Sequence, residues 1–164
     1  MNSNPPIPTK LKEYFIVEEQ HDDFAVKGKL KCSCGSEIFK ILYFGKKGGL
    51  LSPTINKKKT ENGKRIAIDA DCIECHKKIS IYDSFADGLR NCHGEQMFFP
   101  INYTEFICEK CCGKNMNIEI AYNSLGEKEL ISKKCNNWQD CFSMIMISTK
   151  CNLCAKKYNG FIEQ

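Results

Sequence analysis

Four close pairs of cysteines constrain the fold of this chain more than any other feature of its sequence. Cysteines that are one or two residues apart in a tight turn direct both of their sulfurs toward one point. Two such turns that face each other bring four thiols together, and four thiolates are the donor set of a closed, tetrahedral zinc site. The candidate metal ligands are Cys32 and Cys34, Cys72 and Cys75, Cys108 and Cys111, and Cys151 and Cys154.

The cysteine pairs belong to a sequence pattern that occurs twice. The pattern begins with "GKLKCSCGSEIFKILYF" in the first half and with "TEFICEKCCGKNMNIEIAY" in the second. It continues with "IAIDADCIECHKKISIYD" and with "MIMISTKCNLCAKKYNGFIE", and the cysteines of the two copies are separated by nearly constant offsets. We therefore predict two tandem units related by internal duplication, at residues 20–96 and 97–164, preceded by a tail and a lead-in strand at residues 1–19.

The segments beside the cysteines have the pattern of β-strands. Residues 38–44, 65–69 and 118–120 are rich in β-branched or aromatic side chains, and apolar residues alternate with polar ones along much of them. Apolar residues occupy both faces at 144–147, which indicates a more buried strand. Helical periodicity is weak throughout. The predicted fold class is therefore mostly β, with each cysteine pair placed between two strands.

The second unit leaves one ligand ambiguous, because Cys111 and Cys112 are adjacent. Cys111 has the standard spacing from Cys108, whereas Cys112 is followed directly by a glycine, as Cys34 is. We favour Cys111 as the ligand on the spacing. Gly35, after Cys34, suits the left-handed backbone conformation that such turns commonly need.

Zinc competes with three other interpretations of these cysteines. Four thiolates also bind iron in rubredoxin-like sites, and free cysteines pack in protein cores as small apolar residues. The stretch from Cys72 to His76 also matches C-x-x-C-H, the attachment motif of c-type haem. Ala155 stands where the second unit would repeat His76, so we expect no haem and interpret His76 as a surface residue. The repeated spacing of all four pairs favours zinc.

Cysteine pairs in turns between strands resemble those of the zinc ribbon, with its rubredoxin-like knuckles of four cysteines. The resemblance covers most of the chain beyond residue 20 and implies two structural zinc ions per chain. Two features depart from the family pattern. The first knuckle is C-x-C, and the gaps from Cys34 to Cys72 and from Cys111 to Cys151 are longer than the common spacing. No subfamily is identified by these motifs.

Four further cysteines, Cys92, Cys112, Cys135 and Cys141, have no second pair at metal-ligand spacing. With His93 they could form a third metal site or a redox centre, but we interpret them as core or incidental thiols. The first residues of the chain do not have the pattern of a secretory signal, and no apolar run has the length of a membrane span. We therefore expect a cytoplasmic protein with no membrane contact, where thiols stay reduced.

Charge does not by itself point to a nucleic-acid partner. The formal net charge is +4, but two zinc ions held by eight thiolates bring the total to about zero. A local basic segment remains at residues 45–65, which carries seven basic residues and one acidic one. Nucleic acid could bind there through Lys57, Lys58, Lys59, Lys64 and Arg65. The segment contains no aromatic residue for base stacking, and we interpret it as a solvated loop.

The sequence contains no recognisable catalytic arrangement. Four thiolates close a zinc site, whereas catalytic zinc keeps an open position. The three histidines, His21, His76 and His93, have no nucleophile or carboxylate partner at a recognisable spacing. We therefore predict a non-enzymatic zinc protein whose scaffold binds a protein partner, for instance in a bacterial accessory, regulatory or toxin-neutralising role. The alternative is a nucleic-acid-binding zinc ribbon that uses the basic loop.

Overall fold

The computed structural model describes residues 7–21, 25–44, 66–84, 86–87, 102–124, 132 and 140–163, and these are mostly β-structure. The basic segment at residues 45–65, Cys92, His93 and Cys135 lie outside the described residues. One short 3-10 helix, η1 (Thr9–Leu11), precedes the strands. The strands are β1 (Phe15–His21), β2 (Ala25–Leu30), β3 (Phe39–Phe44), β4 (Ala67–Cys72), β5 (Lys78–Asp83), β6 (Thr104–Glu105), β7 (Asn115–Asn123), β8 (Met144–Cys151) and β9 (Lys157–Glu163).

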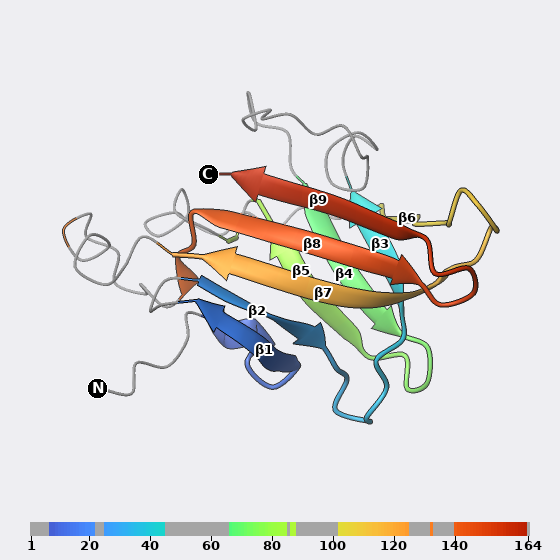
Figure 1. Ribbon diagram of the computed structural model, residues 1–164, viewed down its shortest axis with the longest axis horizontal. Helices are drawn as coiled ribbons and strands as arrows, with labels where there is room; N and C mark the ends of the chain where they lie inside the picture. The colour runs from blue at the N-terminus through green and yellow to red at the C-terminus, as the bar shows by residue number, and fades with distance from the viewer. Residues whose placement is uncertain are drawn as a thin grey trace.

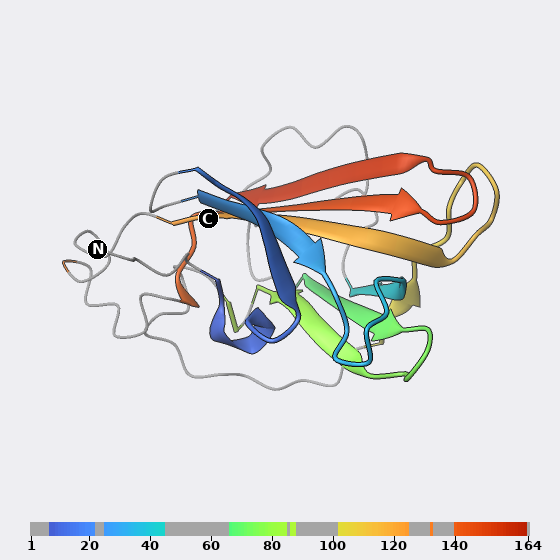
Figure 2. The same cartoon turned by 60° about the horizontal axis from the view of Figure 1, so that its bottom comes forward.

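The strands form one curled antiparallel sheet that folds into two layers. Strands β1, β2, β7, β8 and β9 make one layer, in front of β3, β4 and β5 in Figure 1. Figure 2 shows β4 and β5 below β7, β8 and β9. The mostly β fold class predicted from the sequence is confirmed. Within the described residues, no helix is long and apolar enough to cross a membrane.

Strand β7 joins the two layers and the two halves of the sequence. Along one edge it pairs with β8 from Met116 to Asn123, and along the other it pairs with β2 and then with β3. Strand β6, which belongs to the second half of the sequence, pairs with β3 of the first half. The strand before each half's first cysteine pair therefore pairs with a strand of the other half, so the two halves share one sheet.

Alternation along the strands explains which side chains form the core. In β7 the side chains of Met116, Ile118, Ile120 and Tyr122 are all buried, and the residues between them are only partly buried. The same period of two occurs in β8, because successive side chains of a strand point to opposite faces of the sheet. Each large apolar side chain buried in this way contributes roughly 1.5–3 kcal/mol relative to exposure.

Close packing between β1 and β2 depends on a glycine. A Cβ atom at Gly28 would lie 2.1 Å from the carbonyl oxygen of Ile16 and 2.7 Å from the ring of Phe15. That ring packs in turn against Tyr122, with the two ring centroids 6.1 Å apart. The absence of a side chain at Gly28 therefore lets β1 pair closely with β2 at one edge of the sheet.

The two halves have the same local strand register. Phe39 pairs with Cys72 between β3 and β4, and Met116 pairs with Cys151 between β7 and β8. These positions correspond when the two copies of the sequence pattern are aligned on their cysteines. Each half thus contains a three-stranded antiparallel meander that places its cysteine pairs at one end.

Candidate metal centres

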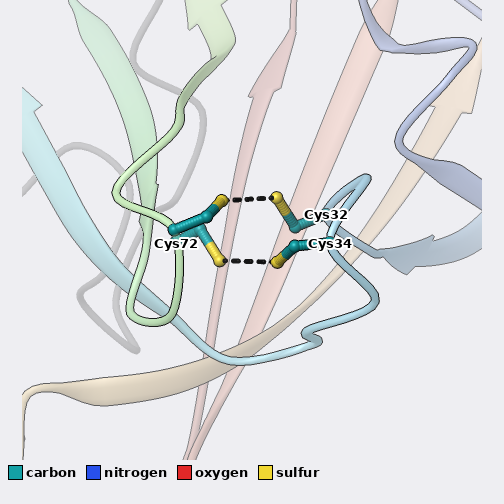
Figure 3. Close-up of side chains that lie close together, drawn as sticks. Cys32, Cys34 and Cys72 are labelled. Carbon is teal, nitrogen blue, oxygen red and sulfur yellow. Dashed lines mark hydrogen bonds between the residues drawn. The ribbon is translucent and has the colours of Figure 1, made fainter.

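The first candidate metal centre, called here centre 1, lies between two loops of the first half. Cys32 and Cys34 come from the loop between β2 and β3, and Cys72 and Cys75 come from the turn between β4 and β5. The Sγ atoms of Cys32 and Cys75 are 3.4 Å apart, and those of Cys34 and Cys72 are 3.5 Å apart. Figure 3 shows Cys32 and Cys34 facing Cys72 across the centre.

The second candidate metal centre, centre 2, has the same construction in the other half. Cys108 and Cys111 lie in the loop before β7, and Cys151 and Cys154 lie at the turn between β8 and β9. The Sγ atoms are 3.5 Å apart both for Cys108 with Cys154 and for Cys111 with Cys151. In each centre all four sulfurs lie within 4.8 Å of one another.

The spacing of the sulfurs fits a tetrahedral metal ion. A zinc–sulfur bond of about 2.3 Å places the sulfurs of a regular tetrahedron about 3.8 Å apart. The observed separations of 3.4 and 3.5 Å are close to this value. A disulfide requires about 2.05 Å, and all eight of these cysteines are free. Both clusters are therefore suited to hold a metal ion.

The second pair of each centre lies in the same kind of turn. The amide of Cys72 donates to the carbonyl of Lys77 at 3.0 Å, and the amide of Cys151 donates to the carbonyl of Lys156 at 2.9 Å. Each turn ends in a left-handed residue, with φ of 57° at His76 and 58° at Ala155. His76 is exposed, and the cysteines before it face the other pair of centre 1.

The first pair of each centre differs by one residue in length. Gly35, with φ of 96°, closes the C-x-C turn, while Cys112, with φ of 57°, occupies the equivalent left-handed position in the longer turn. The side chain of Cys112 is exposed, and Cys111 contributes the sulfur of centre 2. The structure thus brings together the eight cysteines named from the sequence, with Cys111 in the cluster and Cys112 outside it.

Backbone amides donate hydrogen bonds to sulfurs of centre 1, and the pKa values of its thiols differ from one another. Burial raises the pKa of Cys72, but amides of Cys75 and Glu74 and neighbouring thiols donate to its sulfur and bring the pKa down to about 6. The Lys77 amide lowers the pKa of Cys75, yet the interaction with Cys32 and burial raise it to about 12 overall. Four sulfurs this close resist ionising together, and a bound cation removes that resistance.

Centre 2 contains a donor that centre 1 lacks. The buried hydroxyl of Tyr158 donates to the sulfur of Cys108 at 3.2 Å and accepts from the amide of Glu109 at 3.0 Å. The hydrogen bond to Cys108 is the main reason why the pKa of Cys108 falls to about 6. The pKa of Tyr158 itself rises to about 12, mainly because its hydroxyl is buried. Ile79 stands at the position equivalent to Tyr158 in the first half.

Sequence reasoning did not identify Tyr158, although the aligned halves contain the signal. The second half has a tyrosine, a potential hydrogen-bond donor, where the first half has a purely apolar side chain. The ring of Tyr158 packs edge-on against Phe106, with centroids 5.0 Å apart, which holds the hydroxyl at the metal centre. Tyr158 is therefore a candidate positioning residue for Cys108.

The remaining cysteines do not form a third cluster among the described residues. Cys112 is free and exposed, which agrees with an incidental thiol. The interpretation of Cys141 as a thiol is wrong, because this buried cysteine is disulfide-bonded. Burial of Cys141 was expected, but its spacing from the other cysteines did not indicate a disulfide.

No protein-family model, no curated protein and no solved structure matches this chain. The assignment of the two centres therefore depends on their geometry and on the chemistry of their sulfurs.

We predict that Tyr158→Phe weakens metal binding at centre 2 and leaves centre 1 unchanged. The substitution removes the hydroxyl donor to Cys108 but keeps the ring packing against Phe106. Loss of an outer-shell partner typically costs about 10–100-fold in metal affinity. Competition with a chromophoric chelator measures the two affinities separately, with Tyr43→Phe as the control. Equal affinities at centre 2 for the variant and the original chain would contradict a positioning role.

We predict that Cys75→Ser destabilises both halves in one transition. The sequence pattern alone suggests two units that unfold independently, but β2 and β3 both pair with β7. Cys75 is exposed, so its replacement acts mainly through the metal. Hydrogen exchange of β8 and β9 should accelerate together with that of β4 and β5. The variant and the original chain should behave alike after metal removal with a chelator, and unchanged protection of β8 and β9 in the metal-loaded variant would show independent units.

Proposed function

We propose that this chain is a non-enzymatic zinc protein that holds one zinc ion in each four-cysteine cluster and uses the resulting β scaffold to bind a protein partner. The observation that carries the proposal is the convergence of four free thiols within 4.8 Å at two places in one sheet. Zinc supplies folding free energy at such sites, because the unfolded chain has no preformed cluster of sulfurs.

A structural role for the metal is supported by the closed donor set. Each cluster offers four thiols, so a tetrahedral ion has no open position for a substrate or an activated water. Two of these sulfurs per centre are buried, and they form part of the same core as Phe39 and Met116. The metal would therefore act by tying the turns of each meander to the sheet and not by taking part in a reaction.

A non-enzymatic role is supported by the surroundings of the histidines that the structure describes. His21 is exposed and contacts the exposed Glu19, at 3.2 Å, and His76 is exposed in a turn.

Internal duplication accounts for the likeness between the halves. The repeated spacing of the cysteines, the shared strand register and the paired left-handed residues at His76 and Ala155 all support it. A duplicated scaffold with two structural ions leaves its solvent-exposed surfaces available for recognition.

The alternative is binding of nucleic acid through the basic loop. Its candidate contacts, Lys57, Lys58, Lys59, Lys64 and Arg65, lie outside the described residues. If this alternative is right, affinity for nucleic acid should fall steeply with salt and with replacement of Lys57, Lys58 and Lys59 by glutamate.

We predict that the purified chain contains two zinc ions, one for each cluster. Cys111→Ser should lower the content to about one ion, because it removes a sulfur from centre 2. Cys112→Ser is the matched control and should keep both ions, since its side chain lies outside the cluster. Elemental analysis of the folded protein measures both. Iron in place of zinc, or loss of an ion in Cys112→Ser alone, would contradict the assignment.

A further inference from the structure

The surfaces around the two centres carry different charge although their backbones correspond. Residues 107–114 and 150–157, which form the turns of centre 2, contain five lysines and one glutamate. The equivalent residues of centre 1, 31–37 and 71–78, contain three lysines and three acidic residues. Lys114 and Lys156 are ion-paired with Glu105 and Glu109, so the excess positive charge around centre 2 lies on the other three lysines.

Two of these lysines lie opposite each other in the sheet. Lys150 at the end of β8 pairs in register with Lys157 at the start of β9. The equivalent pair beside centre 1 is Asp71 with Lys78, which have opposite charges. Like charges directly opposite each other destabilise a sheet. Lys150 and Lys157 have no ion-pair partner among the described residues, so an anion from outside the chain would relieve their repulsion.

A groove begins at this lysine pair and extends over the outer face of β2, β7, β8 and β9. Its volume is about 460 Å³, and its lining includes Lys150, Lys157, Asn117 and Asn159. Glu119 also lines the groove, but it contacts Lys27 at 3.9 Å. The groove thus offers the ammonium groups of the lysine pair together with amide side chains that can both donate and accept hydrogen bonds.

An apolar side chain stands in the turn next to the lysines. Leu153 is 74% exposed, the most exposed large apolar residue among those described, and Ile107 in the facing loop is 45% exposed. The equivalent residues beside centre 1 are Glu74 and Lys31, which are charged. The exposed side chain of Leu153 is therefore available for an apolar contact, close in sequence to Lys150.

We propose that the surface formed by Lys150, Leu153 and Lys157 binds an acidic segment of a protein partner. Carboxylates of the segment would lie at the Lys150–Lys157 pair, and an apolar side chain of the segment would pack on Leu153. This proposal rests on the proposed function and adds the position and the chemistry of its binding surface.

Nucleic acid fits this surface less well than an acidic peptide. Tyr158 is the aromatic side chain nearest to the lysine pair in sequence, but it is only 5% exposed and Lys156 lies over its ring at 5.2 Å, so it cannot stack on a base. Two glutamates, Glu37 and Glu119, also line the groove and would repel a continuous phosphate backbone. A segment of mixed acidic and apolar side chains matches both the lysines and Leu153.

The test measures binding of defined probes to the full, zinc-loaded chain by fluorescence anisotropy at low salt. The probes are a short labelled peptide of glutamate and leucine, the same peptide with serine in place of leucine, and a thymidine oligonucleotide. We expect the glutamate–leucine peptide to bind best. K150E/K157E and, separately, L153E should each weaken its binding by at least about tenfold, which corresponds to about 1.4 kcal/mol.

The matched control is K31E/K78E beside centre 1, which should leave the affinity unchanged. L153E is compatible with the turn, because Glu74 occupies the equivalent place in centre 1. Lack of peptide binding, or equal affinity of all variants, would overturn the proposal, as would tighter binding of the oligonucleotide that L153E does not affect. Zinc content is measured for every variant. A chain with both ions but no peptide binding contradicts only this surface, whereas a chain without zinc contradicts the proposed function itself.

Discussion

The convergence of four thiols at one point is the interaction on which the rest of this structure depends. Sulfurs 3.4 to 3.5 Å apart resist carrying charge together without a counterion, because like charges repel strongly at this distance. A divalent cation reverses that repulsion and makes each cluster a crosslink between two turns. Such crosslinks would add stability to that of the apolar core.

The position of the clusters also explains why the two halves form one sheet. Each cluster holds the loop before one strand of a meander against the turn between the other two strands. That arrangement leaves one edge of β7 open beside the meander, where β2 and β3 pair with it. Met116 and Phe39, which meet at this junction, are both fully buried. The buried cysteines of both centres therefore belong to the same core as this junction.

The sequence predicted local features well because they depend on nearby residues. The cysteine pairs, the strands beside them and the choice of Cys111 over Cys112 follow from spacing and from alternation over a few residues. The exchange of β2 and β6 between the halves was not predicted, because strand partners are chosen by long-range packing, such as the fit of Phe15 over Gly28. The hydrogen bond from Tyr158 to Cys108 was missed since it needs both the turn and the strand to be placed first.

Differences between corresponding positions locate the features that the scaffold itself does not require. The buried sulfurs, the left-handed turn residues and the strand register are the same in both halves, as expected for positions that packing and metal geometry constrain. Positions on the surface are free of that constraint. Centre 1 has opposite charges across its strands and a charged residue in its turn, which suits contact with water. Centre 2 has like charges across its strands, which costs stability, and an exposed leucine in its turn. The side chains around the two centres therefore differ mainly at positions that packing and metal geometry do not constrain.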